Sequence, residues 1–341
     1  MLSLIGTRKR IVALVIVAGL FASLILMNAV CFRLDNRKLK NAYGRMVEVD
    51  GGQMAVEIYG EGNKETIVIL PGFGSPSPIL EFKPLAMKLA DRYKVITVEP
   101  FGYGLSDGTD SERTVENIVE ELHSCVNKLG CSNYYLMAHS IGGIYSLYWA
   151  NRYQEEVQGF IGIDPSVPKQ NDVMPYASFL SRLSVRLNQA LYCTGITRCL
   201  SLINSDGMVA DYIDEVHTES EIAALKMLAV DNSAGQEISN EMKNLDKNLD
   251  TVRDMIFPAD MDVLMLLSSD NCKRESYWEV LHKNVVRETK DCEITQLEGG
   301  HYLHLTQAEA ISTAVKDHQK QINHPMNSFD QPGDSCQALC Q

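Results

Sequence analysis

Short apolar runs and longer helix-periodic stretches alternate along most of the chain. The runs TIVIL (66–70), KVITV (94–98), YYLMA (134–138), FIGI (160–163) and VLMLL (263–267) are almost free of polar residues. A strand of this kind must be covered on both faces, as in a parallel sheet packed between helices. The stretches between the first four runs, such as SERTVENIVEELHSCVNKLG, have helical spacing. The alternation predicts a doubly wound, mostly parallel α/β sheet, whose ligands bind at the carboxyl ends of the strands.

Two segments depart from this alternation. MVEVDGGQMAVEIYG contains two alternating runs joined by Asp50, Gly51 and Gly52, which predicts a β-hairpin before the parallel sheet. From Pro165 to Pro258 no strand-like run appears, whereas pieces such as SFLSRLSVRLNQALY have helical spacing. A structureless loop of that length is improbable in a compact domain, so we predict an inserted helical cap.

These patterns divide the chain into a core in two parts, with further segments around it. We predict core segments at 46–164 and 259–322, a helical cap at 165–258 and a polar tail at 323–341. The second core segment contains VLMLL, the strand-like EITQL and a final helix near Gln307–Gln321.

The N-terminus contains a long uncharged stretch, from Ile11 to Phe32. As a helix this stretch rises about 33 Å, enough to cross the hydrocarbon core of a bilayer. Three basic residues in the segment 1–10 favour a cytoplasmic N-terminus, although more basic residues follow in the polar linker at 33–45. A cleaved signal peptide is the alternative, but its apolar region is normally shorter. We predict a transmembrane signal anchor at 11–32, in a cell membrane, with an extracytoplasmic catalytic domain.

Charge and cysteine content narrow the function classes. The net charge of −13 argues against a nucleic-acid partner, which needs a surplus of Lys and Arg. Eight of the nine cysteines lie outside the apolar stretch, and an even number fits disulfides in an oxidising compartment. Cys193–Cys199 and Cys336–Cys340 would close the shortest loops; the alternative is that several cysteines are free, buried side chains. No His–Cys cluster has zinc-ligand spacing, so we expect no metal and no cofactor.

Ser140 is the candidate nucleophile. In YYLMAHSIGG a buried strand runs into Ser140 and then into two glycines. At a sharp strand-to-helix turn the central residue is strained, so the residues two before and two after it must be small. Ala138 and Gly142 occupy those positions. The helix that follows directs its N-terminal N–H groups towards the site, where they favour negative charge.

The order LPGFG (70–74), EPFGYGLSD (99–107), AHSIGG (138–143), GGHYLH (299–304) resembles the α/β-hydrolase superfamily. The resemblance covers about residues 46–164 and 260–322, with the cap outside it. It implies that His301 is the catalytic base and that the N–H groups of Phe73 and Ile141 form an oxyanion hole. His304 is the second choice for the base. The family usually has Asp where this chain has Glu99, and Gly where it has Ala138.

The acid of the implied triad has two candidates. Family members most often have it after the strand that corresponds to VLMLL, where this chain reads LSSDN, with Asp270 one place from the usual position and Asn271 on it. Some lipases of the superfamily have it after the strand that follows the nucleophile helix, where this chain has Asp164. We place Asp270 ahead of Asp164. Either carboxylate would hold the imidazole tautomer.

The resulting prediction is a membrane-bound serine hydrolase that acts on a small hydrophobic ester or acyl substrate through an acyl-enzyme. Among the possible reactions we place a carboxylesterase or lipase-like reaction first. The alternatives are an aminopeptidase or amidase of the same fold and a non-catalytic binding protein that kept the fold.

Overall fold

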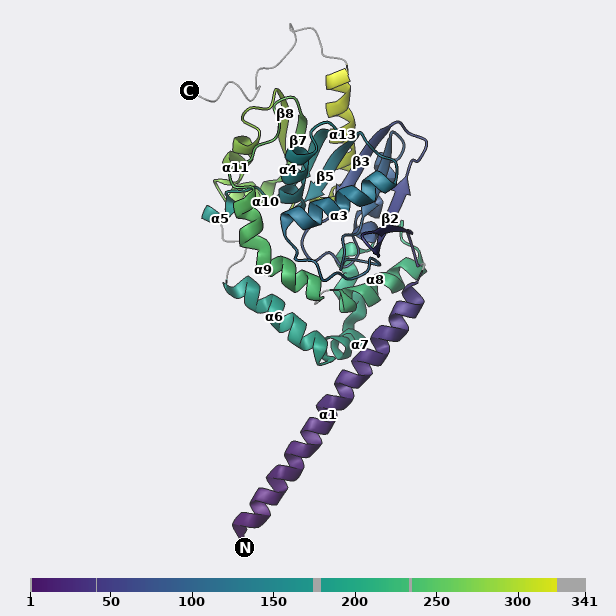
Figure 1. Cartoon of the computed structure of the whole chain (residues 1–341), viewed down its shortest axis with the longest axis vertical. Coiled ribbons are helices and arrows are strands. Elements are labelled where there is room, and N and C mark those ends of the chain that lie inside the picture. The colour runs from purple at the N-terminus through teal and green to yellow at the C-terminus, as the bar shows by residue number, and fades with distance from the viewer. Residues whose placement is uncertain (1, 41, 174–178, 233–234, 324–341) are drawn as a thin grey trace.

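A single eight-stranded sheet forms the centre of the protein. The computed structural model describes residues 2–40, 42–173, 179–232 and 235–323 (Figure 1). The strands lie in the order β1-β2-β4-β3-β5-β6-β7-β8. Their bounds are β1 Arg45–Val49, β2 Gly52–Tyr59, β3 Glu65–Leu70, β4 Tyr93–Val98, β5 Tyr134–His139, β6 Val157–Ile163, β7 Asp262–Ser268 and β8 Asp291–Leu297.

The strand directions confirm the predicted α/β architecture. Strands β1 and β2 form the predicted hairpin, and β2 pairs antiparallel with β4. Every pairing from β4 through β3, β5, β6 and β7 to β8 is parallel. The carboxyl ends of the parallel strands therefore meet at one edge, where a ligand can contact several of them.

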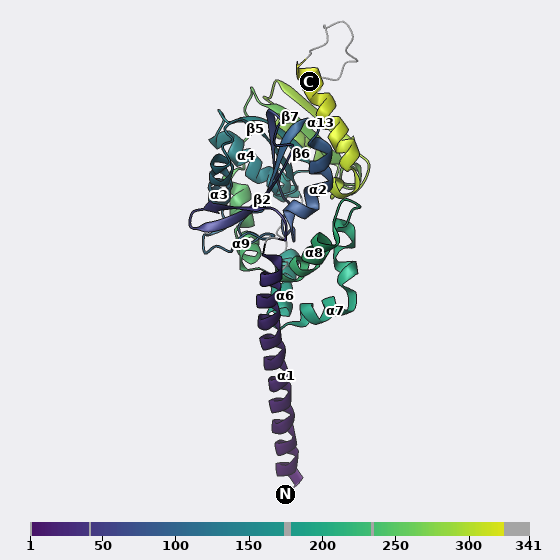
Figure 2. The same ribbon diagram turned by 90° about the vertical axis from the view of Figure 1, so that its right-hand side faces the viewer.

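Helices cover both faces of the sheet (Figure 2). One face packs against α3 (Val115–Lys128), α4 (Gly142–Arg152) and α11 (Trp278–Val285). The other face packs against α2 (Pro78–Leu89) and α13 (Ala308–Asn323). Two further short helices, α10 (Ser269–Arg274) and α12 (Leu303–Thr306), lie in the loops after β7 and β8. The two apolar clusters explain why the strands lack polar residues on either face.

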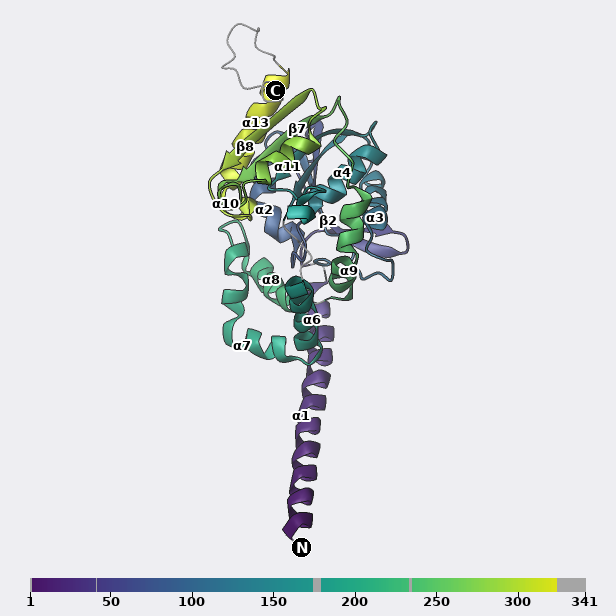
Figure 3. The same ribbon diagram turned by 90° about the vertical axis from the view of Figure 1, so that its left-hand side faces the viewer.

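Helices fill the segment between β6 and β7, which is the segment that lacked strand-like runs (Figure 3). They are α5 (Gln170–Val173), α6 (Phe179–Cys193), α7 (Ile196–Val209), the 3₁₀ helix η1 (Ala210–Tyr212), α8 (Glu219–Asp231) and α9 (Gln236–Thr251). We call these helices the cap.

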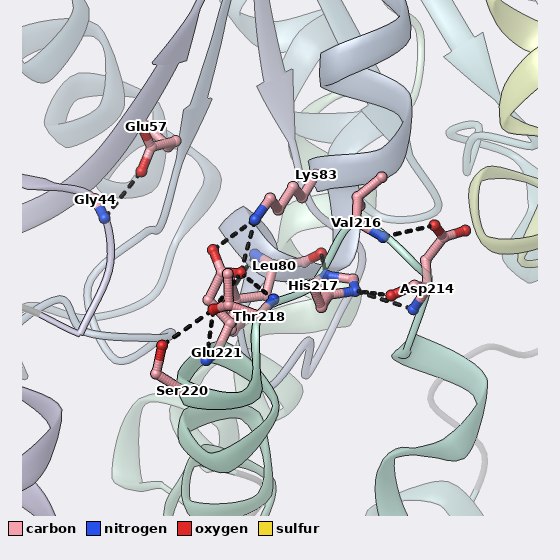
Figure 4. A network of polar contacts seen from close by, with 11 residues as sticks. Gly44, Glu57, Leu80, Lys83, Asp214, Val216, His217, Thr218, Ser220 and Glu221 are labelled. Atoms are coloured by element: carbon pink, nitrogen blue, oxygen red, sulfur yellow. Dashed lines mark hydrogen bonds and ion pairs between the residues drawn. The ribbon is translucent and has the colours of Figure 1, made fainter.

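The cap meets the core at the first turn of α8 (Figure 4). Thr218 and Glu221 form a capping box, in which each side chain bonds the backbone of the other residue. Glu221 also accepts hydrogen bonds from the Lys83 ammonium of α2, at 2.7 Å to each oxygen. The Nε2–H of His217 donates to the carbonyl of Leu80, at 2.9 Å. Glu221 and His217 thus bond α2, and Thr218 bonds the turn itself. These bonds hold the start of α8 in a fixed position on the core.

The N-terminal helix α1 extends from Leu2 to Leu39 and projects from the body of the protein (Figure 1). Its segment Arg10–Leu39 has a mean hydropathy of 2.6 in its most apolar window, which is almost entirely exposed, so it is long and apolar enough to cross a membrane. The predicted linker at 33–45 differs from the structure, because the helix continues through Arg33 to Leu39. Leu39 and Tyr43 are buried with Leu225 and Val209 of the cap, and this packing stabilises the added turns.

The predicted disulfides have different outcomes. Cys193 and Cys199, at the end of α6 and the start of α7, are not bonded to each other. The prediction of that pair from loop length alone is therefore not matched by the structure. Cys336, Cys340 and the predicted polar tail beyond Asn323 lie outside the described residues.

Candidate active site

Ser140 occupies the sharp turn between β5 and α4. Its φ is +51°, a conformation that residues with a side chain rarely adopt. The turn closes tightly: a Cβ added to Gly142 would lie 2.8 Å from the carbonyl of Pro71, and one added to Gly143 would lie 2.6 Å from Pro165. Only glycine fits at these two positions, so the two glycines after Ser140 are required by the turn itself.

The structure brings Ser140, His301 and Asp164 into one hydrogen-bonded row. His301 follows β8, and its Nε2 lies 3.0 Å from the hydroxyl oxygen of Ser140. The other ring nitrogen, Nδ1, lies 2.6 Å from a carboxylate oxygen of Asp164, which follows β6. With Nδ1–H donating to Asp164, Nε2 is free of its proton and can accept the Ser140 hydroxyl. The side chain of Asp164 is fully buried, whereas that of His301 is 28% exposed.

Four donors converge on the carboxylate of Asp164. One oxygen accepts from the backbone N–H of Ser268 at 2.9 Å and from the indole of Trp278 at 2.7 Å. The other accepts from the amide of Asn271 as well as from His301. Burial acts to raise the pKa of Asp164, but the hydrogen bond and charge of His301, with these donors, hold the pKa below its usual value. Asp164 therefore stays ionised and keeps the proton of His301 on Nδ1.

The preference for Asp270 over Asp164 requires correction. Asp270 lies in the first turn of the short helix α10, and it pairs with Lys273, at 4.0 Å, with the Asp270 side chain 61% exposed. Asn271, which stands at the family's usual acid position, is the residue that turns inward and bonds Asp164. This chain thus has an amide where the resemblance implied an acid, and the carboxylate that contacts His301 comes from the end of the neighbouring strand β6.

The loop LPGFG lies against Ser140, as the resemblance implied. A Cβ added to Gly72 would lie 3.2 Å from the Cβ of Ser140 and 2.6 Å from a ring nitrogen of His139. Phe73 follows Gly72 directly, and Ile141, which is buried, follows Ser140. Phe73 and Ile141 are therefore direct chain neighbours of Gly72 and Ser140, the two residues that meet at this contact.

Three buried residues that sequence reasoning missed support this loop. The hydroxyl of Tyr103 accepts from the N–H of Gly74 at 3.2 Å and donates to Glu241 of α9 at 2.8 Å. Tyr145 of α4 donates to the other oxygen of Glu241, at 2.5 Å. Burial raises the pKa of Glu241, although the two phenols oppose the shift. A cap residue thus links the loop to the nucleophile helix, a relation that only the folded chain creates.

Two further histidines, His139 and His304, lie near this site. The Nε2–H of His139 donates to the backbone carbonyl of His301 at 3.1 Å, and burial holds the pKa of His139 well below its usual value. His304 stacks on Phe82 and bonds Glu81 at 2.6 Å. The ligand atoms of Glu81, His139 and His304 lie within 4.8 Å of one another. The direct contact between Glu81 and His304 has the length of a hydrogen bond, and two metal bonds of about 2.1 Å would need a wider separation.

Glu99, which stands where the family usually has Asp, bonds several neighbouring segments of the chain to one another. It is fully buried and accepts hydrogen bonds from Ser77 at 2.8 Å, from the N–H of Leu105 at 2.6 Å and from the hydroxyl of Tyr43 at 3.1 Å. Burial raises the pKa of Glu99 to about 7. A Cβ on Gly104 would overlap this carboxylate, so the glycine is required there. Glu99 joins the segment after α1 to the core and does not touch Ser140 or His301 through any hydrogen bond described in the structure.

Comparisons with known proteins agree with this architecture. The family model for the α/β-hydrolase fold matches residues 65–190. YbdG of Bacillus subtilis, whose function is uncharacterised, is 27% identical over 275 residues, which cover 79% of this chain and 83% of that protein. The 2-(acetamidomethylene)succinate hydrolase of Mesorhizobium japonicum is 27% identical over 116 residues, or 34% of this chain and 41% of that protein.

Solved structures show the same fold over most of the chain. An epoxide hydrolase of Vigna radiata superposes with a TM-score of 0.62 at 17% identity, covering 82% of this chain and 98% of that one. The haloalkane dehalogenase DbeA of Bradyrhizobium superposes with a TM-score of 0.56 at 19% identity, with coverages of 82% and 98%. The parallel sheet, the strained serine turn and the family match lead to one conclusion: the chain has the α/β-hydrolase fold.

Proposed function

We propose that this protein is a serine hydrolase that transfers an acyl group from an ester-like substrate to water. The observation that carries the proposal is the row Ser140–His301–Asp164, with its two short hydrogen bonds. His301 takes the proton of Ser140 as the serine oxygen attacks the carbonyl carbon. The N–H groups of Phe73 and Ile141 stabilise the oxyanion, and His301 then returns the proton to the leaving alcohol. Water, deprotonated by His301, releases the acid and restores Ser140.

The chemistry of a serine nucleophile separates this proposal from the reactions named for the solved structures. A serine oxygen that opened an epoxide or displaced a halide would form an ether with the substrate carbon. An ether has no carbonyl for water to attack, so the enzyme would remain blocked. Attack on an acyl carbon gives an ester, which water can hydrolyse with the same base. Ser140 therefore supports acyl substrates.

Helix α1 supports the second part of the proposal, that the hydrolase is held at a membrane. Its exposed apolar segment is long enough to span a bilayer, and it continues without interruption into the buried contacts of Leu39. A helix joined this way fixes the catalytic domain close to the lipid surface.

A panel of acyl esters with graded chain length, each paired with its amide, tests the reaction class on the full chain in vesicles. We expect ester turnover that Ser140→Ala abolishes, because no other hydroxyl in the described site is bonded to His301. Faster cleavage of the amides would favour the amidase alternative. No turnover of any member, in a protein that folds, would support a binding protein instead.

A further inference from the structure

Helix α6 presents a row of leucines on the face that points away from the protein. Leu180, Leu183 and Leu187 are 73%, 47% and 55% exposed, and their spacing of three and four residues places them on one side of the helix. The opposite side faces inward: Val185 packs against the main core cluster, and Tyr192 lines a cavity of about 870 Å³ between α1, α6 and the core. The leucines therefore lie on the side of α6 that faces away from the core.

Helix α7, which follows α6 and contacts it, also exposes large apolar side chains. Leu200, Leu202 and Ile203 are 55%, 81% and 83% exposed. We call the six side chains on the two helices the cap ridge. Large apolar side chains exposed together on consecutive helices mark a surface that another apolar phase covers.

The cap ridge lies beside the part of α1 that can span a membrane. The amide of Asn28 donates to the carbonyl of Tyr192 at 2.8 Å, and a Cβ on Gly195 would lie 2.9 Å from the carbonyl of Leu24. Leu24 and Asn28 belong to the uncharged stretch that ends at Phe32. At 1.5 Å per residue they lie about 6 to 12 Å below its end, and interfacial helices bury their apolar faces to a depth of about 5 to 10 Å.

A buried ionic contact fixes this arrangement. Arg198 of α7 bonds Asp35 of α1 and Asp231 of α8, both at 2.5 Å, and its Nε–H donates to Asn28 at 3.0 Å. The cap therefore cannot move along or around α1 without breaking several bonds at once. Figures 1, 2 and 3 all place α6 and α7 at the end of the body from which α1 projects.

The charges on α6 suit a lipid surface. Its sequence, FLSRLSVRLNQALYC, contains two arginines and no carboxylate, although the whole chain has a net charge of −13. Arg186 is exposed next to Leu187 in the sequence. Arg182 is paired with Asp246 of α9, so Arg186 is the basic residue exposed beside the leucines. Leucines on one face with a basic residue beside them are the pattern of a helix that lies in the membrane interface.

We propose that α6 and α7 insert the cap ridge into the headgroup region of the bilayer that α1 crosses. The proposal rests on the membrane anchor proposed above and adds a second point of contact. A lipid bilayer is the occupant because the turn between α6 and α7 joins α1 at Leu24 and Asn28, within the apolar segment itself. With one helix across the membrane and two along its surface, the cap has one orientation relative to the lipid.

Tryptophan fluorescence in brominated lipids tests the docking directly. The two native tryptophans, Trp149 and Trp278, are buried in the core, so they serve as a constant background. Full-length Leu187→Trp and Ile203→Trp would be reconstituted in phosphatidylcholine–phosphatidylglycerol vesicles, with and without bromine on the acyl chains. Val280→Trp is the matched control, because Val280 is 52% exposed on α11, away from α1.

We expect brominated lipid to quench both ridge variants severalfold more than the control. Quenching of the ridge variants no greater than that of Val280→Trp, in protein that floats with the vesicles, would overturn the docking and leave the anchor standing. Protein that fails to float would overturn both. Leu200→Trp replaces either ridge variant that does not fold. Ester turnover is read separately, so ridge quenching without turnover would contradict the hydrolase and retain the docking.

Discussion

At the scale of single residues, two positions of the site adopt backbone conformations that their side chains disfavour. Ser140 has a φ of +51° and Asp164 a φ of +42°, and each follows directly after a buried strand. Strain of this kind persists only where surrounding contacts impose it. The carbonyl of Ser140 accepts from the N–H groups of Gly143 and Ser166, and the carboxylate of Asp164 is held by its donors. The strain directs both side chains towards His301.

Asparagine substitution distinguishes the two candidate acids. Asp164→Asn should lower ester turnover by about 10⁴, because the amide cannot hold the proton of His301 on Nδ1. Asp270→Asn, the matched control at the next strand end, should leave turnover close to that of the parent, because Asp270 is exposed. Thermal unfolding of both variants checks that the effect is not a loss of folded protein. The reverse order of activities would contradict the assignment of Asp164.

A second residue-scale prediction concerns Glu99 and pH. The pKa of Glu99 is about 7 in the folded protein against 4.5 for the ordinary group, so the folded state holds a proton that the unfolded chain has lost. Its contribution is complete below pH 4.5 and is lost as the pH rises through 7. A shift of this size corresponds to about 3 kcal/mol.

Glu99→Gln cannot titrate, and it should flatten the dependence of unfolding free energy on pH over this window. Urea unfolding between pH 5 and pH 8 measures the slope for the parent and the variant. Equal slopes would show that another group is responsible for the pH dependence.

At the scale of elements, the strands were predictable and the end of α1 was not. Each parallel strand except the edge strand β8 is apolar on both faces, so its signal is local and does not depend on its neighbours. The extension of α1 past Phe32 depends on Asp35 bonding Arg198 and on Leu39 packing against the cap. Read without these contacts, the stretch 33–45, which has five basic residues, resembles a linker.

Part of the candidate site was also predictable from the sequence. Ser140 was predictable from the small residues that its turn requires, and the placement of His301 came from a resemblance over the loop after β8. The acid was not predictable, because Asp164 and Asp270 follow neighbouring strands and only the fold determines which one turns inward. Glu241 was not predictable either, since it reaches the site from the cap.

The contact between α1 and the cap gives the element-scale prediction. Arg198→Met leaves Asp35 and Asp231 without their shared cation, and breaking a buried pair in this way costs about 3 to 5 kcal/mol. We expect chymotrypsin to cleave the cap faster in this variant than in the parent. Arg186→Met, which removes an exposed arginine from α6, is the control and should be cleaved at the parent's rate. Equal rates for all three proteins would show that the contact does not hold the cap.

At the scale of the whole molecule, the anchor, the cap and the site form a continuous structure. Helix α1 enters the body without a break, the cap is bonded to α1 and to α2, and Glu241 of the cap reaches the loop beside Ser140. The direction of α1 is therefore fixed relative to the candidate site.

This continuity predicts how the protein fractionates. The full chain should remain with the membranes after an alkaline carbonate wash, because α1 exposes an apolar segment with a mean hydropathy of 2.6. Immunoblotting of the washed membranes and the supernatant measures the outcome. A soluble form that begins near residue 30 would show that the segment is a cleaved signal peptide.

The central claim is that Ser140 is an activated nucleophile, and covalent labelling measures this most directly. A fluorophosphonate reacts with a serine only where a base removes its proton and donors stabilise the oxyanion. After incubation of the full-length protein, mass spectrometry of the intact chain and its peptides should find one phosphonyl adduct, on Ser140. Ser140→Ala should gain none, and Asp164→Asn should react far more slowly than the parent. An unlabelled Ser140 in folded parent protein, or equal labelling of parent and Ser140→Ala, would contradict the account.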